Sequence, residues 1–141
     1  MGAVQLTTCE NQSKAPVPAA CLKYTVLVVD DDESFRDLAR GILEPDGFQV
    51  IEAEGVRQGL MRLRSTTVHG IVLDIVMPDR DGLQGVEDLK KVAPRTKIVT
   101  MSGARDAEEF LTVSGYLGAD ASLLKSQVAS LAALMDVLLD S

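Results

Sequence analysis

The stretch that decides the fold is Tyr24-Thr25-Val26-Leu27-Val28-Val29-Asp30-Asp31-Asp32, residues 24–32. Its first six residues are mostly β-branched and apolar, which is typical of a strand buried on both faces of a sheet. The apolar run stops at three consecutive aspartates. Beyond them, apolar side chains recur at helical spacing from Phe35 to Ile42, and Pro45 ends that pattern. We therefore predict a buried strand, an acidic strand end and a helix, in that order.

The same alternation of strand and helix continues to the end of the chain. The further strands that the pattern predicts are 48–52, 68–73, 97–101 and 119–124, and the further helices are 56–63, 83–89, 107–114 and 126–139. Five strands alternating with five helices indicate an α/β fold, a doubly wound parallel sheet with helices on both faces. In such sheets, ligands bind beyond the carboxyl ends of the strands.

Length and charge narrow the class of protein. The chain has 141 residues, 46% of them hydrophobic, and its 14 Lys and Arg against 21 Asp and Glu give a net charge of −7. This size fits one domain, and the acidic balance argues against a nucleic-acid partner or a polybasic membrane anchor. No apolar run approaches membrane-spanning length or forms a signal-peptide core. Cys9 and Cys21 lack the spacing of a metal site, so we expect a cytoplasmic protein with free thiols.

The chain divides into a tail and one domain. Residues 1–22 show no periodicity and are rich in Thr, Ala, Gln and Pro, which predicts a flexible tail, with a recognition peptide as the alternative. Residues 23–141 form the predicted domain. Only residues 126–141 follow Lys125, which is room for one closing helix, so we expect no separate output domain within this chain.

Acidic, hydroxyl and basic residues lie at the carboxyl ends of four of the predicted strands. Asp30 and Asp31 follow the first, Asp74 the third, Ser102 the fourth and Lys125 the fifth. The three carboxylates would repel one another and raise one another's pKa values. A divalent cation resolves the repulsion, and hard oxygen ligands in an incomplete protein shell suit Mg²⁺.

This set of groups fits phosphoryl transfer to a carboxylate. Asp74 is the natural nucleophile because it stands alone at the end of a central strand. Asp30 and Asp31 suit the metal, with the Val76 backbone carbonyl as another protein ligand. Lys125 would neutralise phosphoryl oxygens and the Ser102 hydroxyl would donate a hydrogen bond to one.

At these residues the chain resembles the receiver domains of two-component response regulators. The matching stretches are 26–32 (VLVVDDD), 72–78 (VLDIVMP), 98–103 (IVTMSG) and 118–121 (GADA), followed by Lys125. The resemblance implies a flavodoxin-like fold with strand order 2-1-3-4-5. It also implies that Asp74 accepts phosphate from a histidine kinase or a histidine phosphotransfer protein, that Mg²⁺ binds at Asp30 and Asp31, and that Ser102 is the switch hydroxyl.

The resemblance further implies a signalling domain, not an enzyme in the usual sense, which assists its own phosphorylation and dephosphorylation. Its output would be a contact with a downstream protein. The first helix, which carries Phe35, Leu38 and Ile42, would lie near the histidine protein.

Two positions depart from the receiver pattern. Receivers usually follow the lysine with a proline in a cis peptide, and here Ser126 takes that place. A cis bond before a non-proline residue costs about 2.5–4 kcal/mol, so we predict a trans peptide and an altered loop. Receivers also usually carry an aromatic residue three positions before the lysine, where this chain has Ser122. We expect phosphorylation chemistry to survive both changes, and signalling through an aromatic rotamer to be lost.

Each singled-out residue also has a purely structural interpretation. Asp31 and Asp32 suit a helix cap, Asp74 a turn, Ser102 a cap of the following helix and Lys125 a solvated surface charge. These interpretations do not explain why such residues recur at strand carboxyl ends.

The last predicted helix has two interpretations. Its apolar residues spread over more than one face: Val128, Leu131, Ala132, Leu134, Met135, Val137, Leu138 and Leu139. Either the helix is well buried in the core, or part of this surface forms a homodimer or partner interface.

Two rival functions remain. Residues 26–34 also fit the opening motif of haloacid-dehalogenase-like phosphohydrolases, with Asp30 as nucleophile and Asp32 as acid and base, but this leaves Asp74 unexplained. The other rival is a receiver-like interaction module that works without phosphorylation, which Ser122 and Ser126 favour and the intact acidic set opposes.

Overall fold

The structure is a computed structural model that describes residues 24–77, 80–103 and 107–140. Residues 76–77, 80–82 and 107–111 are described through their backbone. The predicted tail, residues 1–22, lies outside the described residues.

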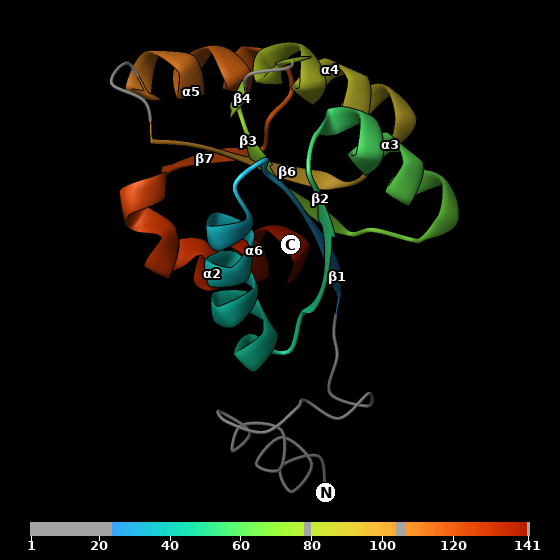
Figure 1. Ribbon diagram of the computed structural model, residues 1–141, viewed down its shortest axis with the longest axis vertical. Coiled ribbons are helices and arrows are strands. Elements are labelled where there is room, and N and C mark those ends of the chain that lie inside the picture. Colours follow the sequence, from blue (N-terminus) through green and yellow to red (C-terminus); the bar gives the residue numbers. More distant parts are fainter. Residues whose placement is uncertain (1–23, 78–79, 104–106, 141) are drawn as a thin grey trace, which may run out of the picture.

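A parallel five-stranded sheet forms the centre of the molecule (Figure 1). Its strands are β1 (Thr25–Val29), β2 (Gln49–Ala53), β3 (Gly70–Asp74), β6 (Lys97–Ser102) and β7 (Ala121–Leu124). They lie in the order β2-β1-β3-β6-β7 and every neighbouring pair is parallel. Numbered along the chain as the first to fifth strands of this sheet, the order is 2-1-3-4-5, which confirms the predicted topology.

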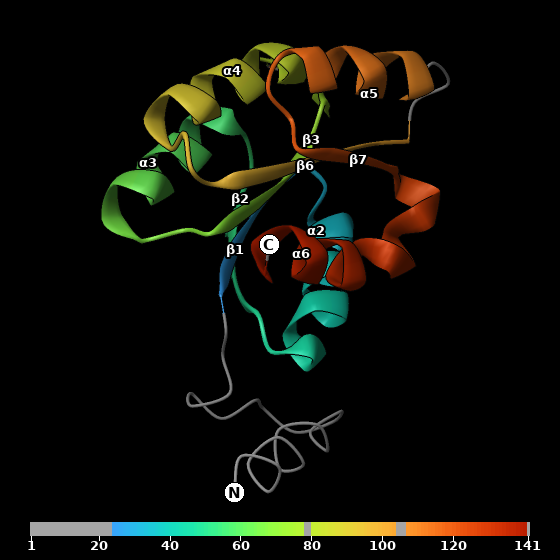
Figure 2. The ribbon, with the colours of Figure 1, turned by 180° about the vertical axis from the view of Figure 1, so that it is seen from behind.

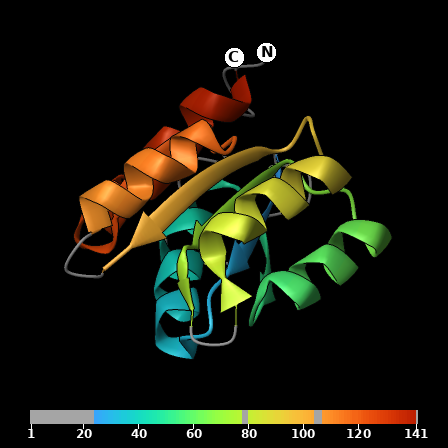
Figure 3. The same ribbon diagram turned by 90° about the horizontal axis from the view of Figure 1, so that it is seen from above.

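Helices cover both faces of this sheet. They are α2 (Glu33–Leu43), α3 (Val56–Ser65), α4 (Gly82–Val92), α5 (Ala107–Tyr116) and α6 (Leu131–Asp140). Helices α2 and α6 lie on one face and α3, α4 and α5 on the other, as the views from opposite sides agree (Figures 1 and 2). Seen from above, α5, α4 and α3 follow one another across the sheet (Figure 3).

Strand β1 contributes side chains to the hydrophobic cores on both faces of the sheet. All five of its residues are buried, and successive side chains of a strand point to opposite faces. Val26 and Val28 join the core under α2 and α6, whereas Leu27 and Val29 join the core under α3 and α4. Burying such a side chain contributes about 1.5–3 kcal/mol each. The continuous apolar run therefore places the strand in the middle of the sheet, with its acidic end directed to the edge where ligands bind.

The closing helix differs from its prediction. Residues 126–139 do not form one helix, because a 3-10 segment (Lys125–Ser130) precedes α6. Gln127 has non-helical backbone angles there, and its side-chain oxygen accepts a hydrogen bond from the Leu124 amide at 2.9 Å. That bond turns the chain after β7 before α6 can begin. Leu131 and Met135 are buried against the sheet, which confirms a core role for α6, while Val137 is 67% exposed.

The connections between elements show one further difference and one agreement with the predictions. A two-stranded antiparallel ribbon of β4 (Val76–Met77) and β5 (Arg80–Asp81) follows β3, and the sequence pattern did not predict these strands. Strands of two residues are too short to show an alternating pattern. No cis peptide bond occurs among the described residues, so the Lys125–Ser126 bond is trans as predicted. No helix in the described part of the chain is long and apolar enough to cross a membrane.

Candidate functional site

Three carboxylates meet at the carboxyl edge of the sheet. Asp30 directly follows β1 and Asp74 is the last residue of β3, and these strands are neighbours with Val29 beside Leu73. One carboxylate oxygen each from Asp30, Asp31 and Asp74 lies within 4.8 Å of the others. Asp30 is 1% exposed and Asp74 is 5% exposed, whereas Asp31 is exposed. The sheet thus brings together the three acids that the sequence singled out.

Lys125 reaches this cluster from the end of β7. Its Nζ lies 2.8 Å from Asp30 Oδ2 and 3.5 Å from Asp74 Oδ2, and 4.4 Å above the centre of the Phe35 ring. Burial by itself would lower the pKa of Lys125, but the ion pair with Asp30 and the charge of Asp74 outweigh it and raise this pKa. Lys125 is therefore held protonated against two buried carboxylates.

The donor set fits a divalent cation. One lysine beside three carboxylates leaves a local excess of negative charge. Asp30 Oδ2 is buried, and the Lys125 ammonium lies 2.8 Å from it. Hard oxygen ligands with a partly exposed member such as Asp31 suit Mg²⁺, which keeps several of its waters.

Ser102 and Val76 lie where the topology predicts. Ser102 is the last residue of β6, is fully buried, and pairs with Leu124 at the end of β7, next to Lys125. Val76 begins β4, two residues beyond Asp74. The structure brings Ser102 to the same sheet edge as the acids. Ligation by the Val76 carbonyl stays a prediction.

The three consecutive aspartates have different structural roles. The Asp32 side chain caps α2 by accepting a hydrogen bond from the Ser34 amide at 3.0 Å. The Asp32 amide in turn donates to Asp30 Oδ1 at 2.9 Å. Asp32 thus has the structural role of a helix cap, which argues against its use as an acid and base, and Asp31 keeps an exposed carboxylate.

Sequence reasoning missed an ionic cluster behind the site. Arg36 and Arg40 of α2 both contact Glu52 of β2, at 2.8 and 2.7 Å, and Arg40 also contacts Glu44 at 2.6 Å. Arg36 additionally donates to the Asp30 carbonyl at 2.7 Å. The available signal was two arginines four residues apart on α2, but their partner on β2 follows only from the packing of that helix on the sheet.

Ser122 is exposed, and its hydroxyl is hydrogen-bonded to the buried Thr100 hydroxyl. Thr100 Oγ1 of β6 lies 2.7 Å from Ser114 Oγ of α5 and 2.9 Å from Ser122 Oγ of β7. Thr100 and Ser114 are fully buried. Where receivers usually have an aromatic side chain, this chain therefore joins β6, α5 and β7 through short hydrogen bonds.

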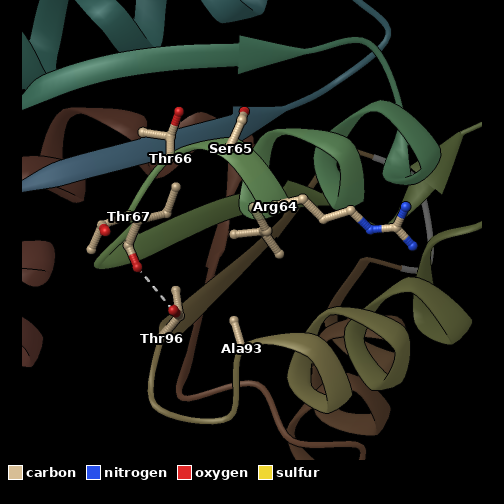
Figure 4. Close-up of a pocket in the computed structure, with 8 residues that line it drawn as sticks. Arg64, Ser65, Thr66, Thr67, Ala93 and Thr96 are labelled. Atoms are coloured by element: carbon tan, nitrogen blue, oxygen red, sulfur yellow. Dashed lines mark hydrogen bonds between the residues drawn. The ribbon is translucent and has the colours of Figure 1, made fainter.

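A pocket elsewhere on the surface is separate from this site (Figure 4). Its lining comes from the end of α3 and the residues before β3, 63–68, and from Ala93 and Thr96 between α4 and β6. These segments lie at the amino ends of β3 and β6, whereas the acids lie at the carboxyl ends. Thr96 Oγ1 donates to the Val68 carbonyl there at 2.9 Å.

Known proteins share both the sequence pattern and the fold. The model of the response regulator receiver domain family matches residues 26–136. The KDP operon transcriptional regulatory protein KdpE of Escherichia coli is 32% identical over 100 residues, which cover 71% of this chain and 44% of KdpE. The chemotaxis protein CheY of Bacillus subtilis is 28% identical over 82 residues, 57% of this chain and 68% of CheY. The chain thus spans less than half the length of KdpE.

A solved structure agrees with these relatives. The CheY-like receiver domain protein from Methanospirillum hungatei superposes with a TM-score of 0.76 at 30% identity, covering 84% of this chain and 94% of the other. The strand order, the acidic cluster and these similarities agree, and the flavodoxin-like arrangement is the one expected. The chain belongs to the response regulator receiver domain family of two-component signalling.

Proposed function

We propose that Asp74 accepts a phosphoryl group from a phosphohistidine of a histidine kinase or histidine phosphotransfer protein. The observation that carries this proposal is the place of the Asp74 carboxylate, which is buried at the end of the central strand β3, close to the Asp30 carboxylate and 3.5 Å from the Lys125 ammonium. Asp30, Asp31 and Asp74 would hold Mg²⁺, together with the Val76 carbonyl.

The reaction is a displacement at phosphorus. A carboxylate oxygen of Asp74 attacks, a phosphorus–oxygen bond forms, and the phosphorus–nitrogen bond to the histidine breaks as the histidine leaves. Lys125 can follow the transferred group because its Nζ already lies 3.5 Å from Asp74 Oδ2. The Ser102 hydroxyl would donate to another phosphoryl oxygen. Bound Mg²⁺ supplies neutralisation of the phosphoryl charge.

The proposed partners follow from this chemistry. A phosphohistidine protein would deliver the phosphoryl group, and a downstream protein would read the phosphorylated domain in the cytoplasm. A homodimer through the C-terminal helix stays a prediction, which the exposed Val137 on α6 supports. We propose neither a nucleic-acid nor a membrane partner for this domain.

A specific observation favours a second candidate, an interaction module that works without phosphorylation. The three hydrogen-bonded hydroxyls of Thr100, Ser114 and Ser122 lie where receivers usually carry the aromatic side chain that reports phosphorylation. Such a module would present a constant surface to its partner and would not need its acidic site to accept phosphate.

Intact mass spectrometry after incubation with acetyl phosphate and Mg²⁺ separates these candidates. We expect one phosphoryl group on the wild type and on Asp37→Asn, a control on the exposed surface of α2, and none on Asp74→Asn. Absence of the adduct on the wild type would favour the interaction module. An adduct that survives in Asp74→Asn and disappears in Asp30→Asn would favour a phosphohydrolase-like nucleophile.

A further inference from the structure

Arg36 connects the acidic cluster to the edge strand of the sheet. Its side chain is 12% exposed and crosses from α2 to β2, where Nε lies 2.8 Å from Glu52 Oε1. Its Nη1 donates to the Asp30 backbone carbonyl at 2.7 Å. One guanidinium thus holds a carboxylate of the neighbouring strand and a main-chain oxygen of the site at once, which its fixed fork of donors allows.

The contact with the carbonyl completes the fixation of Asp30. The Asp30 amide donates to the Ala53 carbonyl at 3.1 Å, and Asp30 Oδ1 accepts from the Asp32 amide at 2.9 Å. The carbonyl that Arg36 holds belongs to the peptide plane that Asp30 shares with Asp31. Its orientation therefore fixes where the Asp31 Cα lies, and the exposed Asp31 carboxylate extends from that atom.

Glu52 is ionised, and its negative charge balances the positive charge of the arginines that contact it. The hydrogen bond from Arg40, together with the bond from Arg36, lowers the pKa of Glu52 against the opposing effect of burial. The two arginines are matched by Glu52 and Glu44. Arg36 therefore adds little net positive charge beside the acids and does not repel a cation from them.

We propose that Arg36, anchored by Glu52, is a positioning residue for the cation site, which it shapes by holding the Asp30 carbonyl. The inference rests on the proposed function, because it requires that Asp30 and Asp31 bind Mg²⁺. Arg36 touches neither the cation nor the phosphoryl group. Partners of this outer kind typically change metal affinity by about 10–100-fold when they are removed.

Arg40 is the matched control for this proposal. It lies one turn further along α2 and contacts the same Glu52 carboxylate, but its other partner is Glu44 and not the Asp30 carbonyl. Arg40→Met therefore breaks the ionic cluster while it leaves the contact with the site in place. Arg36→Met removes both.

The test is a titration with Mg²⁺ alone, followed through the Asp31 and Asp32 amide signals in NMR spectra of the full chain. We expect the Kd for Mg²⁺ to rise about tenfold or more in Arg36→Met. We expect Arg40→Met to stay within about twofold of the wild type, because the Asp30 carbonyl keeps its donor. Equal Kd values in wild type and Arg36→Met, or equal losses in both variants, would overturn the role of Arg36.

Two further variants keep the result interpretable. Arg36→Lys retains the charge and most of the stem, so it is the variant to titrate if Arg36→Met does not fold. With one ammonium in place of the fork, its Kd should also exceed that of the wild type, and an unchanged Kd would contradict the proposal. Asp31→Asn tests the site itself. If the wild type does not bind Mg²⁺, or if Asp31→Asn binds it equally well, the cation site fails and this inference fails with it.

Discussion

The two ends of the parallel sheet are built from similar residues but differ in their charge balance. At the amino end, Lys90 Nζ lies 2.9 Å from Asp120 Oδ2 and donates to the Thr96 carbonyl, and the same Asp120 oxygen accepts from the Ile98 amide at 2.9 Å. One lysine and one carboxylate balance there. At the carboxyl end, one lysine faces three carboxylates.

The difference shows what a functional end of such a sheet requires. The balanced pair of Lys90 and Asp120 joins α4 to β6 and to the residue before β7, and it has no excess charge for a ligand to neutralise. An unbalanced set costs stability unless something of opposite charge arrives, because buried like charges repel. The acidic end is thus the only one of these two ends that a cation and a phosphoryl group can stabilise.

Removal of Lys125 tests this contrast and should give the largest effect. Lys125→Met removes the ammonium that contacts both Asp30 and Asp74, so we expect the free energy of unfolding to fall by about 3 kcal/mol in the absence of Mg²⁺. Mg²⁺ should recover more stability in this variant than in the wild type, as urea unfolding with and without the ion would show. Exposed Lys91→Met is the control. A Lys125→Met protein that gains no more from Mg²⁺ than the wild type does would contradict a site in need of positive charge.

The amino end should respond more weakly and without a metal effect. Asp120→Asn keeps the shape of the side chain but removes its charge, so the bonds to Lys90 and to the Ile98 amide weaken. We expect a loss of about 1–2 kcal/mol in urea unfolding. The loss should be equal with and without Mg²⁺. A loss that Mg²⁺ reverses would mean that the two ends are coupled.

Alkaline pH should give the smallest effect and act on the carboxyl end. The pKa of Lys125 is raised above its ordinary value of 10.5, so its contribution to stability is complete below about pH 10.5 and is lost as the pH rises through the folded-state pKa. The stability difference between wild type and Lys125→Met should therefore shrink above pH 10.5. Urea unfolding between pH 9 and 12 measures it, and a constant difference over that range would show that the ion pairs with Asp30 and Asp74 do not stabilise the fold.

The sequence predicted the parts of this molecule that depend on patterns along the chain. The apolar run from Val26 to Val29 is continuous because both faces of β1 are covered, and this is also why the acids that follow it reach the sheet edge. The topology then brings Asp74 and Lys125 to the same edge from distant positions. Each of these predictions needed only the strand order and the rule that parallel strands end together.

The rest depends on contacts across the fold. Gln127 bends the chain after β7 by bonding the Leu124 amide, and a helical pattern of apolar residues does not reveal such a break. The Glu52 contacts of Arg36 and Arg40 need α2 packed over β2. The three hydrogen-bonded hydroxyls of Thr100, Ser114 and Ser122 likewise come from three elements that only tertiary packing brings together.

The direct passage from β1 into α2 has a consequence for the acidic end. The amino terminus of a helix carries a partial positive charge, equivalent to about half an elementary charge, from backbone N–H groups that have no partner in the helix. α2 begins at Glu33, immediately after the three aspartates, and the Ser34 amide bonds the Asp32 carboxylate. The helix dipole therefore stabilises the negative charge that gathers at this end of the sheet. An insertion of one residue between Asp31 and Glu33 would move the acids away from that support.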